Sequence, residues 1–104
     1  MKDIVFLGDS LERIREFPGK ARRHAGLELR RVQHGLEPVD WKPMKSIGPG
    51  VREIRVRESA GAFRILYVAA YAHAVYVLHA FQKKTQATAR RDLDLAMLRL
   101  RLLQ

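Results

Sequence analysis

Three successive runs between Val51 and Thr85 are rich in valine, isoleucine, leucine and aromatic residues, with arginine and lysine at recurrent positions. In the first run apolar and polar side chains alternate. A period of two is typical of β-strands, whose side chains point to opposite faces of a sheet. The last run is apolar at nearly every position, which predicts a central place in the sheet. The predicted strands are Val51–Glu58, Ala62–Ala70 and Val75–Lys83.

Earlier in the chain, apolar residues recur every three or four positions, which predicts two helices after a short strand at Asp3–Leu7. Asp9 and Ser10 both offer an N-cap, and Glu12 stands three residues after Asp9, as in a capping box. Pro18 suits the first turn of the second helix. We expect the two helices to form a hairpin that lies on a sheet. Their apolar stripes are Leu11, Ile14 and Phe17, then Ala21, Ala25, Leu29 and Val32.

Residues 36–50 contain three of the four prolines and two glycines, which predicts a loop with a brief strand at Met44–Ser46. We interpret Trp41 as an anchor that holds this loop to the body, and an exposed base-stacking platform is the alternative. Thr88 is the expected N-cap of a last helix that runs to the C-terminus.

The last helix carries two apolar stripes about half a turn apart. Leu93, Ala96, Met97, Leu100 and Leu103 form an ordinary core face, whereas the second stripe is Leu95, Leu98 and Leu102. One helix face cannot bury both stripes against a single sheet. More of the same domain, a partner chain or a second copy can cover the second stripe, and we predict that it is a partner interface.

The order strand, two helices, loop, three strands, helix predicts a small α+β fold with one antiparallel or mixed sheet. At 104 residues we expect a single domain over residues 1–104. No apolar run approaches a membrane span, and the N-terminus does not resemble a cleaved leader. The chain has no cysteine, which suits a reducing compartment, so we expect a cytoplasmic protein.

Charge is the strongest global signal, because twenty Lys and Arg stand against eleven Asp and Glu, for a net charge of +9. Such a field favours a polyanion as partner. If the predicted strands pair, several cations come together, and Arg64 lies among apolar neighbours where a charge must be paired. This basic cluster is Arg55, Arg57, Arg64, Lys83 and Lys84.

The sequence lacks the signatures of metal sites, of nucleotide cofactors and of covalent nucleophiles. The four histidines show no metal-binding spacing, and no phosphate-binding glycine loop follows a strand, so we expect neither a metal nor a cofactor. There is no Cys nucleophile and no GxSxG elbow. Asp92 and Asp94 near the start of the last helix are explained by the helix dipole. His79, alone in an apolar strand, is interpreted as packed rather than catalytic.

The basic cluster meets the minimum for cutting RNA. Arginine forks bind phosphate oxygens and stabilise the charge of a pentavalent phosphorus, while RNA supplies its own 2′-hydroxyl nucleophile. A lysine crowded by arginines has its ammonium form disfavoured, so it can transfer a proton near neutral pH. The alternative is that the same residues hold a polyanion without reacting with it.

Two segments carry a resemblance: REIRVRESAGAFRILYVA, and VYVLHAFQKKTQATARRDLDLA after it. Together they resemble the RelE/ParE toxin superfamily in its phage-derived HigB-like branch, and the resemblance covers essentially the whole chain. It implies a type II toxin that cleaves mRNA on the ribosome and is neutralised by a cognate antitoxin of the helix-turn-helix class. A homodimer within the toxin–antitoxin complex is a further expectation.

By position, the resemblance implies a phosphate clamp at Arg64 with Arg55 as its helper. Lys83 or Lys84 would be the proton donor or a second phosphate contact. Further RNA contacts are expected at Arg57, Arg52, Lys45 and Arg90.

The chain also departs from the family pattern. Val51 replaces a common tryptophan, Phe63 replaces a tyrosine, and no tyrosine follows Tyr76 to serve as the RelE general base. His79 is the remaining substitute in that region. The alternatives to a ribonuclease are a ParE-like gyrase poison and a non-catalytic basic module that binds RNA or protein.

Overall fold

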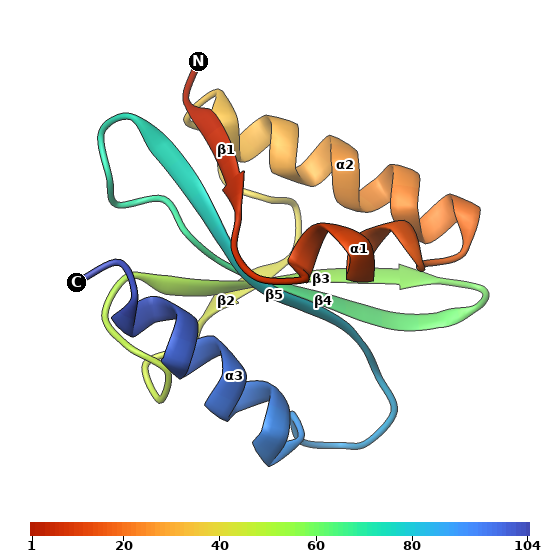
Figure 1. Cartoon of the computed structure of the whole chain (residues 1–104). Helices are drawn as coiled ribbons and strands as arrows, with labels where there is room; N and C mark the ends of the chain where they lie inside the picture. Colours follow the sequence, from red (N-terminus) through yellow and green to blue (C-terminus); the bar gives the residue numbers. More distant parts are fainter.

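The computed structural model describes all 104 residues as five strands and three helices (Figure 1). All five strands belong to one sheet with the order β1-β5-β4-β3-β2. β1 runs parallel to β5, and the other neighbours are antiparallel, so the predicted α+β class with a mixed sheet is confirmed. The elements are β1 (Asp3–Phe6), α1 (Ser10–Arg15), α2 (Gly19–Gln33), β2 (Trp41–Pro43), β3 (Val51–Glu58), β4 (Gly61–Val68), β5 (Ala74–Lys83) and α3 (Arg90–Arg101).

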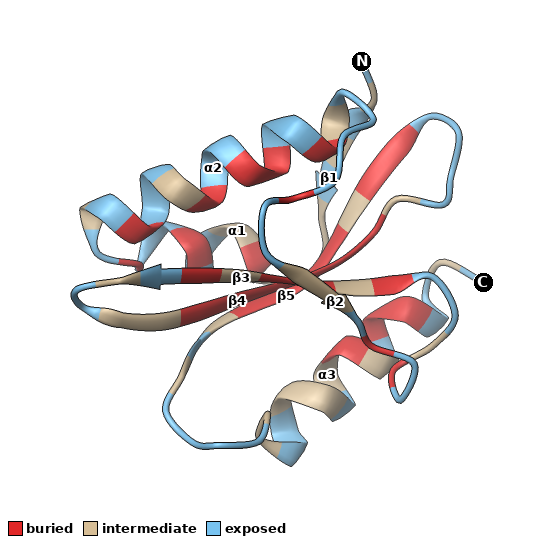
Figure 2. Ribbon diagram, turned by 180° about the vertical axis from the view of Figure 1, so that it is seen from behind, coloured by how far each residue is buried: buried red, intermediate tan, exposed pale blue.

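The sheet separates two apolar cores. The helical hairpin of α1 and α2 covers one face, where the predicted stripe of α2 packs on β3, β4 and β5. Figure 2 shows the buried bands of α2 turned toward the sheet. This larger core includes Ala21, Ala25, Leu29 and Val32 of α2 with Ile54, Ile65 and Val77 of the sheet.

On the opposite face, α3 packs through Ala96 and Leu100 against Leu66 and Leu78. Arg64 lies two residues from Leu66 toward the β3–β4 turn, on the same face of β4. Figure 1 shows the β3–β4 hairpin extending past the loop that leads from β5 to α3. The helix therefore covers one end of this face, and it does not cover the end that carries Arg64.

One strand prediction was wrong. β2 is at Trp41–Pro43 rather than Met44–Ser46, because Met44 is buried in the smaller core and begins a turn, with the Ile47 N–H donating to its carbonyl. The central place predicted for β5 is confirmed, since β5 lies between β1 and β4. Trp41 is half-buried with the Arg52 guanidinium 4.1 Å from its ring centre, which fits the anchor interpretation.

The predicted helix caps also differ. Asp9 occupies the N-cap position of α1 but makes no capping hydrogen bond, so the capping box is wrong. Its carboxylate instead accepts a hydrogen bond from Arg99 of α3 at 2.7 Å, which lowers the pKa of Asp9. Arg99 also donates to the Leu78 carbonyl and so ties α3 to the sheet. The N-cap of α3 is Ala89, not Thr88, again without a side-chain cap.

Candidate functional site

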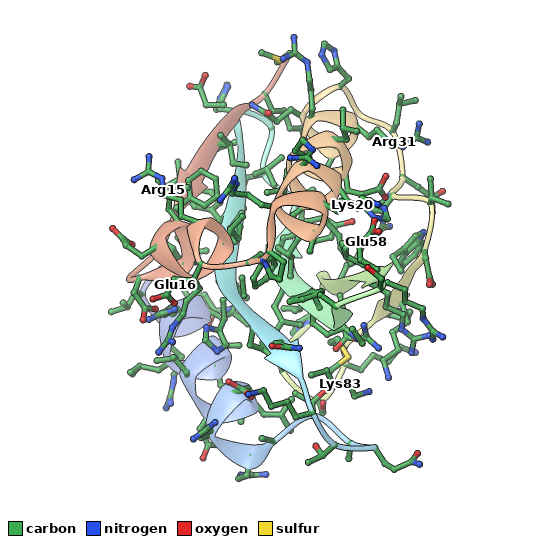
Figure 3. All side chains as sticks on the ribbon, turned by 90° about the vertical axis from the view of Figure 1, so that its right-hand side faces the viewer. Arg15, Glu16, Lys20, Arg31, Glu58 and Lys83 are labelled. Atoms are coloured by element: carbon green, nitrogen blue, oxygen red, sulfur yellow. The ribbon has the colours of Figure 1, made fainter.

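The face of the sheet beyond α3 collects cations from three neighbouring strands. Arg55 of β3 stands directly opposite Arg64 of β4. Ala62 of β4 lies between Arg57 on one side and Lys83 on the other. Strand alternation puts these four basic side chains on one face. The structure therefore brings together the predicted basic cluster, and Figure 3 shows Lys83 at the end of β5.

A shallow groove of about 640 Å³ opens beside these side chains, and we call it the basic groove. Three of the predicted catalytic residues line it, whereas Arg55 lies behind Arg64. Lys84 stands at its exposed rim. Such a concentration of cations in a concavity suits a phosphate group. The lining residues are Arg57, Glu58, Gly61, Ala62, Arg64, Lys83, Lys84, Thr85 and Gln86.

Arg64 is held by a buried counter-ion. Its side chain is 5% exposed, and its Nε lies 3.4 Å from Oε1 of Glu53, whose side chain is fully buried. The Nε of Arg55 lies 3.5 Å from the same oxygen. Arg64 also donates a hydrogen bond from Nη1 to the Phe63 carbonyl. The expectation that Arg64 must be paired is confirmed, and two arginines share one carboxylate, so the site keeps an excess of positive charge.

Electrostatics at the groove favour an anion. Burial lowers the pKa of Arg64, and Glu53 opposes that effect. The guanidinium stays charged because arginine does not lose its proton in proteins. Burial also lowers the pKa of Lys83, and the nearby charge of Arg64 lowers it further. A phosphate entering the groove would relieve this repulsion.

His79 and Asp92 form a pair that the sequence did not indicate. His79 is buried in β5, and its Nε2 lies 2.8 Å from Oδ1 of Asp92 in the first turn of α3. Its Nδ1 is buried without a partner, and its ring stacks on Phe81. Asp92 therefore does more than complement the helix dipole, because it fastens α3 to the sheet. The arrangement fits a packed histidine whose Nε2–H donates to the carboxylate.

This pair makes stability depend on pH. Burial lowers the pKa of His79 in spite of Asp92, so the unfolded chain binds a proton at a pH where the folded chain does not. Stability is therefore expected to fall as the pH drops below about 6.5, the ordinary histidine value. Urea unfolding between pH 8 and pH 5 measures this loss. The His79→Gln variant should show a shallower fall over the same range, and an unchanged slope would contradict the assignment.

The other predicted RNA contacts lie elsewhere. Arg52 belongs to the opposite face of β3, where it covers Trp41. Lys45 is exposed in the turn after β2, and Arg90 is exposed at the start of α3, paired with Asp94 at 3.1 Å. None of these three lines the basic groove.

Sequence reasoning missed two residues of the site. Glu53 is the counter-ion just described, and Lys42 stands opposite it on β2. The charge of Lys42 also contributes to the lowered pKa of Lys83. Alternation would have placed Lys42 on this face if the short strand β2 had been predicted at the right residues. The structure brings no three His, Asp or Glu side chains close enough to hold one metal ion.

The second stripe of α3 is not covered by the domain itself. Leu98 is 52% exposed and Leu102 is 74% exposed, while Leu95 is half-buried. None of the three helices has the length and apolar content that crossing a membrane requires. An apolar stripe left open on a short helix is the kind of surface that a partner protein covers.

Comparison with known proteins adds the family. Residues 12–101 match the family described as "Phage derived protein Gp49-like (DUF891)". The match spans α1 through α3 and so includes the basic groove and the leucine stripe. No curated protein matches the chain significantly. The chain therefore belongs to the Gp49-like family of phage-derived proteins, a RelE-like toxin family associated with toxin–antitoxin systems.

Proposed function

We propose that the protein is a HigB-like type II toxin that cleaves mRNA on the ribosome, in the cytoplasm. The observation that carries this proposal is the clamp formed by Arg64 and Arg55, opposite each other on adjacent strands and both within reach of buried Glu53. A buried arginine is costly unless it is paired, and its place in the lining of an open groove suits recognition of a phosphate. The family association and the net charge of +9 support the same reading.

The chemistry needs only groups that the RNA and the groove supply. The 2′-hydroxyl attacks the neighbouring phosphorus, and the bond from phosphorus to the 5′ oxygen breaks, leaving a 2′,3′-cyclic phosphate. Arg64, helped by Arg55, neutralises the charge that builds on the phosphoryl oxygens. Lys83, with its lowered pKa, accepts the hydroxyl proton, and Lys84 at the rim donates a proton to the 5′ oxygen.

Primer extension on mRNA in a translating extract tests this function. The protein is expected to create new 5′ ends within translated codons, and Arg30→Ala on the exposed side of α2 should leave them unchanged. A parallel assay of DNA supercoiling by gyrase tests the alternative function, that of a gyrase poison. Absence of new cuts together with lost supercoiling would favour a gyrase poison, and binding of RNA without either effect would favour a non-catalytic module.

We also infer a cognate antitoxin, of the helix-turn-helix class that the HigB-like resemblance implies, as the partner of α3. The open stripe of Leu95, Leu98 and Leu102 offers an apolar contact surface, and the positive charge of the chain suits an acidic partner. A homodimer within the complex would cover the same stripe. Both arrangements place the contact on the face of α3 that turns away from Ala96 and Leu100.

Leu98→Glu is expected to weaken this complex by at least about tenfold, because it puts a charge into an apolar contact. The isolated domain should keep its stability, since Leu98 is already half-exposed. Co-purification with the antitoxin followed by titration calorimetry measures the effect. Leu27→Glu, at an exposed leucine of α2, is the matched control. A Leu98→Glu protein that unfolds would instead place this leucine in the domain's own core.

A further inference from the structure

One aromatic ring stands directly beside the arginine clamp. Phe81 of β5 is the register partner of Arg64 on β4, and the Cα atoms of such partners lie about 4.5–5.5 Å apart. Both side chains are on the α3 face of the sheet, because Phe81 packs against the smaller core. Trp41 lies on the opposite face, where the Arg52 guanidinium covers its ring. A phosphate held by Arg64 therefore has Phe81 as its aromatic neighbour.

The ring of Phe81 is held in place from one side. The His79 ring stacks on it, with ring centres 5.3 Å apart and an angle of 26° between the planes. His79 is fixed in turn by Asp92, whose Oδ1 lies 2.8 Å from Nε2. Phe81 itself is only half-buried, so part of its ring remains open. Because the ring is preorganised in this way, little conformational freedom is lost when a second ring stacks on it.

Phe81 lines a cleft of about 670 Å³, which we call the side cleft. This volume falls within the range of about 300–1,000 Å³ that is usual for sites that bind small molecules. The side cleft joins the basic groove, because Lys83, Lys84 and Thr85 line both. Figure 3 labels two of its lining residues, Glu16 after α1 and Lys83 at the end of β5. A nucleotide whose phosphate lies in the basic groove can therefore place its base in the side cleft.

The carboxylate in the side cleft indicates which bases would fit. Asp92 lines the cleft, and its side chain is 16% exposed. Oδ1 is committed to His79, whereas Oδ2 makes no hydrogen bond within the chain. An ionised carboxylate accepts hydrogen bonds and cannot donate them. It therefore favours a base with an exocyclic amino group, which cytosine, adenine and guanine carry and uracil lacks.

We propose that the side cleft is a nucleobase-binding site. Phe81 stacks on the base next to the phosphate that Arg64 holds, and Asp92 accepts a hydrogen bond from the amino group of that base. The ligand is a segment of single-stranded RNA, whose unstacked bases are free to bind an aromatic ring. The identity of this ligand rests on the proposed function, to which Phe81 and Asp92 add selection of the base beside the cut.

Short RNA probes that cannot be cut test the site at equilibrium. Each probe is a tetranucleotide of uridines with every 2′-hydroxyl methylated, and 2-aminopurine replaces one base at a time. This base carries an amino group and loses fluorescence when it stacks on an aromatic ring. We expect the wild-type protein to quench the fluorescence most strongly at one position of the probe.

Phe81→Leu is expected to abolish the quenching at that position and to lower the affinity by at least about fivefold, since leucine keeps apolar packing but cannot stack. Phe81→Tyr keeps the ring and is the matched control. It should retain the quenching and bind within about twofold of the wild-type protein. Urea unfolding shows whether either variant loses stability.

A probe with an abasic nucleotide at the same position separates stacking from a structural role of Phe81. Removing the base and removing the ring delete the same contact, so Phe81→Leu should bind the abasic probe within about twofold of the wild-type protein. Probes with cytidine or uridine at that position test Asp92, because the two rings have the same size. The wild-type protein should prefer cytidine by at least about threefold.

Equal weakening of the 2-aminopurine and abasic probes by Phe81→Leu would overturn the proposal, because Phe81 would then support only the fold. Quenching that survives in Phe81→Leu, or the absence of binding by any probe, would also overturn it. Equal or tighter binding of the uridine probe would overturn the part assigned to Asp92. Quenching that depends on Phe81 in a protein that cuts no mRNA would refute the nuclease function and leave the base site intact.

Discussion

Arg64→Lys is expected to lower the rate of mRNA cleavage by about 10²- to 10³-fold, the usual effect of removing one transition-state donor. Lysine keeps a positive charge beside Glu53 but loses the planar fork that binds two phosphate oxygens. The loss should therefore appear in the cleavage step, with a smaller effect on RNA affinity. Single-turnover cleavage in programmed ribosomes measures the rate directly.

Arg57→Lys is the matched control for this prediction. Arg57 belongs to the same groove but is exposed and makes no ion pair, so its replacement should cost only a few-fold. Unfolding in urea shows whether either variant loses stability. Equal rates for wild type and Arg64→Lys, with both proteins folded, would remove Arg64 from the chemistry and leave it as a structural residue.

Glu53→Ala is expected to destabilise the fold by about 3–5 kcal/mol, because it leaves the charge of Arg64 buried without a counter-ion. Glu53 is completely buried, and it is the only carboxylate within ion-pair distance of Arg55 and Arg64. Arg55 would then repel Arg64 without the shared oxygen between them. Urea unfolding at neutral pH measures the loss.

The double variant Glu53→Leu/Arg64→Leu separates the charge effect from the packing effect. Replacing a buried ion pair by apolar residues of similar size is often neutral for stability. We expect the double variant to recover most of the stability lost in Glu53→Ala while it remains unable to cut RNA. A Glu53→Ala protein as stable as wild type would mean that Arg64 reaches solvent in solution.

Much of the fold follows from local patterns. Runs of β-branched, leucine and aromatic residues predict β3, β4 and β5 to within two residues at each end, and the three-to-four period predicts the buried stripe of α2. β2 was misplaced because a three-residue strand that ends in Pro43 has no period to detect. The caps differ because Asp9 is drawn to Arg99, ninety positions away along the chain, and local patterns carry no such contact.

In the candidate site, too, local patterns predict some features and long-range contacts decide the others. Alternation along β3 predicts that Arg55 and Arg57 lie on the same face of the sheet. The same rule predicts that Arg52 lies on the opposite face, together with Ile54. The place of Arg52 outside the basic groove is therefore already contained in the sequence. The pairing of His79 with Asp92 joins β5 to α3, so it depends on how the helix packs and has no signature in either segment.

Cleavage of a defined mRNA in the ribosomal A site tests the central claim most directly. The wild-type protein should cut an all-ribose message and leave a 2′,3′-cyclic phosphate, and it should spare the same message with a single 2′-deoxy nucleotide at the cut position. The Arg64→Lys protein should cut the all-ribose message far more slowly than the wild-type protein does, and it should not cut the 2′-deoxy message. Cutting of the 2′-deoxy message at the same position, or equal cutting by Arg64→Lys, would contradict the account.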